Sequence, residues 1–355
     1  MYIIEGNSFD EVYRKAIMAI LREGDEVSPR GSKTYELAPA TIVIKNARKF
    51  LTMPRLRKGN YTFQIAEALW MLRGSNDLEE IAHYNSIWRN FEDEDEPGIL
   101  NGAYGERLRN WGANNDPYDK YPGIDQFYEV YEKLKKDPYS RQAVMVIWDP
   151  DRDNAIHESG NYSKDIPCTN YFNFQIRNGK LNMWTVMRSN DLHKGSIYDI
   201  PNFIIFQHIL AGWLDVEVGK YTHSAASLHI YENDVENFID IFNDNEDVEV
   251  YDKEYPDLRL SLIDFNNVME AISVLELYSR GTSSKEVFKE NIEHYIKILN
   301  QIENKWWKSI GAQLALYNYR KLGSSENEFK IFLPYITSEY RKHYENLKEI
   351  KKWAK

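Results

Sequence analysis

The segment that decides the fold is "SKDIPCTNYFNFQIRNGKLNMWTVMRSNDLHKGSIYDIPNF", residues 163–203. It contains Cys168, the single cysteine among 355 residues. Apolar and polar residues alternate over 169–177 and 181–189, and the Asn-Gly-Lys between them is typical of a β-hairpin turn. The largely apolar run at 200–214 predicts a buried helix. A strand pair that leads into a buried helix indicates an α+β core.

Two side chains of this segment need an explanation. A thiol becomes a nucleophile when nearby cations stabilise its thiolate, and Arg188 lies in the strand pair that Cys168 opens. A lone cysteine is also a common inert core residue, so the residues alone leave both interpretations open. Asp199 is a carboxylate within an otherwise apolar run. A buried carboxylate is costly unless it has a role.

Composition limits the class of protein. Apolar residues make up 43% of the chain and aromatic residues 14%, which is typical of a globular protein. The net charge of −11 argues against a general nucleic-acid binder. A single cysteine, no basic-then-apolar segment at the N-terminus and no apolar run of about 18 residues together predict a cytoplasmic protein without a membrane span.

The remaining pattern predicts further elements and two domains. Helices are predicted for 8–22, 61–74 and 127–138, and strands for 34–46, 141–150 and 219–233. From residue 263 the chain is helical in period and nearly free of proline. We therefore expect an α+β core over 1–262 and a helical C-terminal extension over 263–355.

Several motifs occur in an order that resembles thymidylate synthases and the related pyrimidine hydroxymethylases. They are Pro167-Cys168, Arg188-Ser189-Asn190-Asp191, Gly195, Asp199 and His229-Ile230-Tyr231. Upstream, the resemblance extends to Arg30, Glu67 in "EALWMLRGSND", Trp88 and Phe91 in "SIWRNF", Tyr104 in "NGAYGERLRNW" and Arg141 in "DPYSRQAVMVIW". It covers about 8–262 and implies a thymidylate-synthase-like mixed sheet packed by helices.

The resemblance implies a catalytic chemistry. Cys168 would attack C6 of a pyrimidine nucleotide, which makes C5 nucleophilic toward the one-carbon unit of 5,10-methylenetetrahydrofolate. Glu67 would move protons through water, and Tyr104 would assist removal of the C5 proton. The resemblance implies this folate as co-substrate and no metal.

It also implies binding roles. Arg30, Arg141 and Arg188 would bind the 5′-phosphate of a nucleoside monophosphate with Ser189, and His229 and Tyr231 would contact the sugar. Asp191 would hold the pterin, and Trp88 and Phe91 would pack on the folate rings. One phosphate arginine in the family comes from the partner subunit, so Arg141 implies a homodimer.

Asp199 occupies the position where thymidylate synthases carry asparagine. An amide matches uracil, whereas a carboxylate accepts from the N4 amino group of cytosine and can share a proton with N3. It would also face uracil O4 with negative charge, which disfavours uridylate. We therefore expect a cytidylate 5-hydroxymethylase. The phage enzymes with the same exchange favour dCMP, and ribonucleotide hydroxymethylases in the family keep CMP open.

Departures from the family pattern keep other functions open. Thr169 replaces the histidine after the nucleophile, Gln142 replaces the second phosphate arginine, and Ala226-Ser227 replaces a Gly-Asp pair. One alternative is C5 methylation with dihydrofolate formation, since the choice between water and hydride cannot be read from the residues. A second is a non-catalytic nucleotide- or RNA-binding relative, against which Cys168, Glu67 and Arg188 argue.

Overall fold

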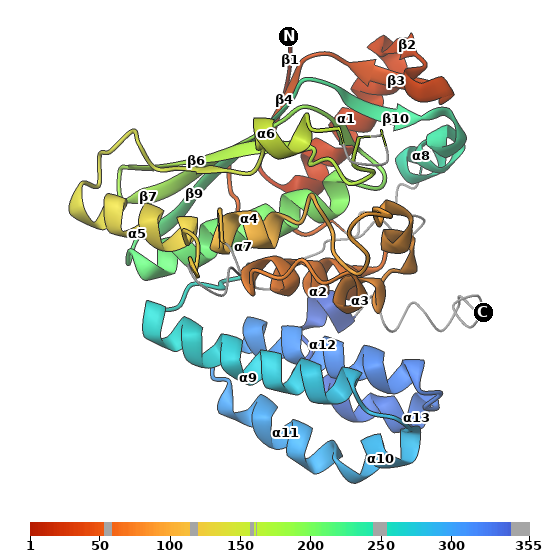
Figure 1. Ribbon diagram of the computed structural model, residues 1–355, viewed down its shortest axis with the longest axis vertical. Coiled ribbons are helices and arrows are strands. Elements are labelled where there is room, and N and C mark those ends of the chain that lie inside the picture. The colour runs from red at the N-terminus through yellow and green to blue at the C-terminus, as the bar shows by residue number, and fades with distance from the viewer. Residues whose placement is uncertain (53–58, 114–119, 157–159, 161, 244–253, 342–355) are drawn as a thin grey trace. The chain divides into compact units, whose positions relative to one another are not determined.

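A computed structural model describes residues 1–52, 59–113, 120–156, 160, 162–243 and 254–341. The chain forms two compact units, Met1–Glu246 and Asp247–Lys355 (Figure 1). The predicted boundary between 262 and 263 rests on the change in sequence pattern and stays a prediction. We describe each unit by itself.

The first unit is built on a six-stranded mixed sheet in the order β1-β4-β9-β7-β6-β5. β1 pairs with β4 and β7 with β9 in parallel, while the remaining pairs are antiparallel. The predicted hairpin forms as β6 and β7. The strands are β1 (Tyr2–Gly6), β4 (Ala40–Ile44), β5 (Val144–Val146), β6 (Thr169–Arg177), β7 (Lys180–Met187) and β9 (Glu217–Ala225).

A second, four-stranded sheet has the order β2-β3-β10-β8. Its strands are β2 (Asp25–Val27), β3 (Thr34–Leu37), β8 (Asn190–Asp191) and β10 (Leu228–Tyr231). The predictions of one continuous strand over 34–46 and over 219–233 are wrong, because each range forms two strands in different sheets. Pro39, which has no N–H for a strand ladder, lies at the first break. Alternation along a strand does not reveal which sheet it joins.

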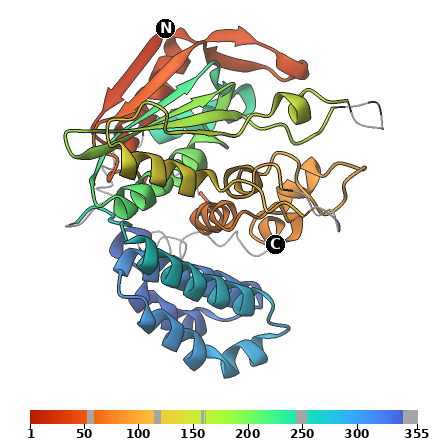
Figure 2. The ribbon, with the colours of Figure 1, turned by 60° about the vertical axis from the view of Figure 1, so that its left-hand side comes forward.

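Helix α7 (Ser196–Trp213) packs against β7 and β9 on the inner face of the six-stranded sheet. It is apolar on all sides and almost wholly buried, as predicted, but it starts at Ser196 and so includes Asp199 in its first turn. Figure 2 shows α5 and α7 on the same side of this sheet. The other helices of the unit are α1 (Phe9–Glu23), α2 (Tyr61–Leu72), α3 (Leu78–Ala82), α4 (Tyr104–Arg109), α5 (Gln126–Lys136), α6 (Pro150–Asp153) and α8 (Val235–Asn243), with 3-10 helices η1 (Pro29–Gly31), η3 (Ser86–Phe91) and η4 (Glu232–Asp234).

The second unit is helical, as predicted for the region after 263. Trp307 is fully buried in it and donates a hydrogen bond from Nε1 to the Leu258 carbonyl (2.9 Å). Phe288 and Tyr319 stack in its interior with ring centroids 4.4 Å apart. Its helices are α9 (Leu262–Arg280), α10 (Lys285–Glu290), α11 (Ile292–Gln301), α12 (Lys305–Lys321), α13 (Glu326–Phe329) and η5 (Lys330–Tyr335). Within the described residues, no helix combines the length and apolar character that a membrane crossing requires.

A fully buried ion pair holds α4 in place. Arg107 donates two hydrogen bonds to the Asp153 carboxylate (2.7 and 2.8 Å) and others to the carbonyls of Ile147 and Asn101 (2.8 and 2.9 Å). Both charged side chains are inaccessible to solvent. Because α4 begins at Tyr104, this pair also positions that tyrosine.

Removing one partner of this pair should be strongly destabilising. We expect Asp153→Asn to lower the free energy of unfolding by about 3–5 kcal/mol, because the Arg107 charge is then buried without a counter-charge. Glu106→Gln is the matched control: Glu106 lies on the same helix and pairs with Arg152 (2.9 Å) where Arg152 is 36% exposed. It should cost about 0–1 kcal/mol. Urea unfolding followed by circular dichroism measures both, and equal losses would contradict the expected difference.

Candidate active site

Cys168 lies just before β6, half-buried, beside the first residue of α4. The backbone N–H groups of Cys168 and Thr169 donate to the Tyr104 hydroxyl (3.2 and 3.1 Å). The pairing of β6 with β7 shifts register between Thr169 and Tyr171. Such irregularities redirect side chains next to functional sites. The lone cysteine and Tyr104, predicted from distant segments, therefore meet.

Arg188 is held against the same loop. Its backbone N–H donates to the Cys168 carbonyl (2.9 Å), and its guanidinium donates to the carbonyls of Pro167 (2.8 Å) and Ile166 (2.9 Å). Burial raises the pKa of the Cys168 thiol, while Arg188 and, more weakly, Arg30 act in the opposite direction. The thiol is thus protonated at rest, with two cations near enough to favour its thiolate.

Glu67 is buried on α2 and faces α7. Asn202 on α7 donates from Nδ2 to the Glu67 carboxyl (2.8 Å), and its Oδ1 accepts from Gln64 (2.7 Å). Burial, followed by the nearby Asp199, raises the pKa of Glu67 well above its ordinary range. A carboxyl that holds its proton more tightly than usual can act as a general acid.

Asp199 lies in the first turn of α7. Burial, followed by Asp191, raises its pKa to about 6, while the hydrogen bond from Asn190 acts in the opposite direction. Asn190 Nδ2 donates to Asp199 Oδ2 at 2.7 Å. The same Asn190 accepts through Oδ1 from Ser196 and contacts His223 Nε2 at 3.1 Å. Asp199 therefore stands at the end of a buried polar network.

The nucleotide-binding residues predicted from the sequence lie on several elements. Arg30 is exposed in η1 with a φ of 54°, and its charge acts on Cys168. β10 pairs with β8 so that His229 is opposite Asp191. The His229 ring packs edge-on against Tyr231 at 5.4 Å. Ser189 is half-buried directly before β8. The second sheet therefore carries the predicted sugar-contacting pair.

Two of the predicted folate-contacting residues, Trp88 and Phe91, form a separate cluster, whereas Asp191 lies on β8 opposite His229. Trp88 and Phe91 lie in η3 with ring centroids 5.7 Å apart, and Phe91 is 39% exposed. Trp88 also packs on Trp70 of α2 at 6.1 Å, one helical turn from Glu67. Helix α2 thus links this aromatic pair to the buried carboxyl. Asp191 accepts from the backbone N–H groups of His193 (2.7 Å) and Lys194 (3.2 Å).

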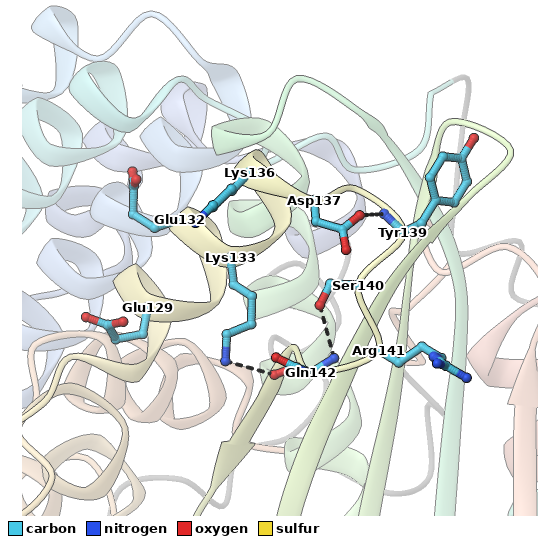
Figure 3. A pocket seen from close by; sticks show the side chains of 9 residues that line it. All are labelled: Glu129, Glu132, Lys133, Lys136, Asp137, Tyr139, Ser140, Arg141 and Gln142. Atoms are coloured by element: carbon cyan, nitrogen blue, oxygen red, sulfur yellow. Dashed lines mark hydrogen bonds between the residues drawn. The ribbon is translucent and has the colours of Figure 1, made fainter.

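Arg141 lies away from Cys168 within one chain. Val144 pairs with Asn173, so Arg141 is level with the far end of β6. At about 3.3 Å per residue, the roughly eight residues back to Cys168 span about 25 Å. Figure 3 shows Arg141 at the edge of a surface pocket that also contains Glu129 and Lys133, with its side chain directed away from those of α5.

Three polar residues at the site were not assigned a role from the sequence. Asn202 lies one turn after Asp199 in the same apolar helix. Two polar residues at that spacing share one face of a helix, which indicates that both belong to the same site. In the sequence, Asn190 is the variable residue of the Arg-Ser-x-Asp motif, which gives it no distinguishing signal. His223 occupies an inward-facing position of β9, where alternation predicts an apolar residue. Burial lowers the pKa of His223 to about 3, so its ring is neutral.

The arrangement combines a thiol near two arginines, a buried tyrosine hydroxyl and two carboxyls of raised pKa. Burial, followed by Cys168 and Asp199, raises the pKa of Tyr104 well above its ordinary range, so it stays a hydrogen-bond donor. These groups suit covalent addition coupled to proton transfer. The described residues contain no cluster of three or more His, Cys, Asp or Glu side chains that could hold a metal ion.

Comparison with known proteins identifies the family. The model of the thymidylate synthase family matches residues 11–279, which include every predicted site residue. A deoxyuridylate hydroxymethyltransferase from Bacillus phage SP01 is 39% identical over 236 residues, 66% of this chain and 60% of that relative. The chain thus spans less than two thirds of the relative's length. Because the family match extends over well more than half of its residues, the chain belongs to the thymidylate synthase family.

Proposed function

We propose that this protein transfers a one-carbon unit from 5,10-methylenetetrahydrofolate to C5 of a cytidylate and releases the 5-hydroxymethyl nucleotide. The observation that carries the proposal is the half-buried Cys168 thiol beside Arg188 and Tyr104, with Asp199 close enough to influence its pKa. A nucleophile, a cation, a proton donor and a base-reading carboxyl are therefore grouped together. dCMP is the favoured substrate, and CMP is the alternative.

Each proposed step uses a group of this site. The Cys168 thiolate adds to C6, and C5 then bonds to the methylene carbon of the folate. The C5 proton leaves to a water molecule held by the Tyr104 hydroxyl, and Glu67 protonates the leaving amine of tetrahydrofolate through water. Water adds to the exocyclic methylene, and Cys168 is expelled from C6. The sum is nucleotide, methylenetetrahydrofolate and water in, hydroxymethyl nucleotide and tetrahydrofolate out.

Arg30, Arg188 and Ser189 would bind the phosphate, and His229 and Tyr231 the sugar hydroxyl. Guanidinium groups match phosphate geometry, and Arg188 is already oriented by two backbone carbonyls. Trp88 and Phe91 would pack on the folate rings, and Asp191 would hold the pterin. A partly exposed aromatic pair suits this purpose because it offers apolar surface for a planar ring.

A uridylate substrate is the second candidate, and a specific observation favours it. A carboxyl with a pKa of about 6 is partly protonated near neutral pH. In that form it presents one donor and one acceptor, as an amide does, and can match uracil N3–H and O4. The phage relative is named for deoxyuridylate. Methylation with dihydrofolate formation is a further outcome that the assay below distinguishes.

We propose that the protein works as a homodimer in which Arg141 of one subunit binds the phosphate held by the other. The distance of Arg141 from Cys168 within one chain supports this. So does the outer face of the six-stranded sheet, where Val144, Val146 and Trp184 are 38%, 39% and 44% exposed. Exposed apolar side chains on one sheet face are typical of a protein interface.

We also propose a cytoplasmic location, which the single cysteine supports.

The reaction is tested by tritium release from [5-³H]dCMP, [5-³H]CMP and [5-³H]dUMP with methylenetetrahydrofolate. Release from a cytidylate without an absorbance rise at 340 nm is expected, since no dihydrofolate forms. Cys168→Ser should abolish release while nucleotide binding by calorimetry persists. Release from dUMP with a rise at 340 nm would identify a methylating enzyme, and no release from any nucleotide would favour a non-catalytic relative.

Base choice is tested by Asp199→Asn. We expect the ratio of kcat/KM for dCMP to that for dUMP to fall by about 100-fold or more, because an amide cannot share a proton with cytosine N3. Competition between the two tritiated nucleotides measures the ratio directly. Glu67→Gln is the control, since it should slow both nucleotides and leave the ratio unchanged. An unaltered ratio in Asp199→Asn would mean that another residue reads the base.

The shared site is tested by mixing inactive chains. If Arg141 acts across the interface, chains carrying Arg141→Ala and chains carrying Cys168→Ser should regain about a quarter of wild-type activity after joint refolding, because half of the dimers hold one intact site. Lys133→Ala, in the same pocket, should keep full activity by itself. If the mixture is no more active than its components, Arg141 does not act in the partner's site.

A further inference from the structure

The hydrogen bond between Asn190 and Asp199 has a fixed polarity. Asn190 Oδ1 accepts from the Ser196 hydroxyl and lies 3.1 Å from His223 Nε2. Two groups therefore occupy the acceptor end of the amide, and the donor end, Nδ2, is directed at Asp199 Oδ2 (2.7 Å). Asn190 is only 3% exposed, so water does not compete for these contacts.

Ser196 sets this orientation by donating to Asn190 Oδ1, and the His223 ring fits it. The ring is neutral and so carries one N–H. Since Asn190 Oδ1 can only accept, that N–H lies on Nε2 and donates to it. The other ring nitrogen, Nδ1, lies 2.9 Å from the Tyr221 hydroxyl, which itself donates to Thr185 Oγ1. A reversed Asn190 amide would lose the Ser196 donor and turn its oxygen toward a carboxyl, which is costly in a buried network.

The two oxygens of Asp199 are consequently not equivalent. Oδ2 accepts a hydrogen bond from Asn190, which stabilises it as the oxygen without a proton. Among the described residues, Asp199 Oδ1 has no hydrogen-bond partner. A proton on Asp199 therefore resides on Oδ1. Cytosine and uracil present opposite donor and acceptor orders at positions 3 and 4, so a carboxyl with one defined donor oxygen matches one of them and not the other.

We propose that Asn190, oriented by Ser196 and His223, is the positioning residue that determines which pyrimidine base Asp199 accepts. This inference rests on the proposed function, in which Asp199 reads the base. Without Asn190, the Asp199 proton can move between the two oxygens, and the site can match either base.

Gly195 provides a separate indication that the space around the Asn190–Asp199 hydrogen bond is restricted. A Cβ added at Gly195 would lie 2.9 Å from Asn190 Nδ2 and 3.1 Å from Asp199 Oδ2. The first distance is shorter than real Cβ contacts and falls on the donor atom of the hydrogen bond. Glycine at the N-cap of α7 therefore leaves room for the Asn190–Asp199 contact, which any larger residue would displace.

The test uses Asn190→Asp, which keeps the shape of the side chain but removes its fixed donor. The measured quantity is the ratio of kcat/KM for [5-³H]dCMP to that for [5-³H]dUMP with methylenetetrahydrofolate. We expect the wild-type preference to shrink by about 10- to 100-fold. Ser196→Ala, which removes one of the two donors to Asn190, should shift the ratio in the same direction by less. It keeps the inference testable if Asn190→Asp does not fold.

A pH profile supplies a readout that a purely structural role would not move. The Asn190 donor stabilises ionised Asp199, so its replacement by a carboxyl should raise the pKa of Asp199 above about 6. The corresponding inflection of kcat/KM should move to higher pH. The other titratable groups near Asp199 stay in place in both proteins: Asp191, Glu67, Cys168, Tyr104 and Tyr221.

Asn202→Asp is the matched control, because Asn202 donates to Glu67 as Asn190 donates to Asp199. It should slow both nucleotides equally and leave the ratio unchanged. If Asn190→Asp also slows both equally, with an unmoved pH profile, Asn190 is only structural and the inference fails. The wild-type ratio tests the proposed cytidylate preference separately, because a ratio below one would mean that uridylate is preferred and would refute that proposal. The change of the ratio on mutation would still test Asn190.

Discussion

The burial of α7 is the constraint on which the first unit depends. This helix packs against β7 and β9 and is almost wholly buried, so an unpaired polar group on it is costly. Asn202 donates a hydrogen bond to Glu67, and Asp199 accepts one from Asn190. Two amide–carboxyl pairs, one turn apart, therefore follow from placing polar residues on an apolar helix. The pairs also hold both carboxyls in defined orientations.

The same enclosure adjusts the proton affinities that the proposed chemistry needs. Burial raises the pKa of Glu67 and of Asp199, and it keeps the Tyr104 hydroxyl and the Cys168 thiol protonated at rest. Arg188 opposes this effect at the thiol, since an adjacent cation favours the thiolate.

Support for these groups comes from elements that lie outside the site. Tyr104 begins α4, and α4 is anchored by the buried Arg107–Asp153 pair. Trp88 packs on α2, the helix that carries Glu67. Arg141, in contrast, lies three residues before the edge strand β5 (Val144–Val146), far along β6 from the thiol. The predicted site residues are therefore held by many different elements, which explains why no local motif contains them all.

Sequence alone determined the family resemblance, the β6–β7 hairpin, the apolar helix after it and the helical character of the second unit, because alternation and helical period are local properties of the chain. It also singled out Cys168, Glu67, Tyr104, Arg188 and Asp199. Only the tertiary structure decided that residues 34–46 and 219–233 each divide between two sheets, since a strand's partner is a non-local choice. It alone showed the contacts of Asn190 with Ser196, His223 and Asp199, because hydrogen bonds made by the folded chain leave no periodic signal. Strand pairing and side-chain orientation depend on contacts with distant parts of the chain, whereas the hydrophobic pattern is a property of each segment.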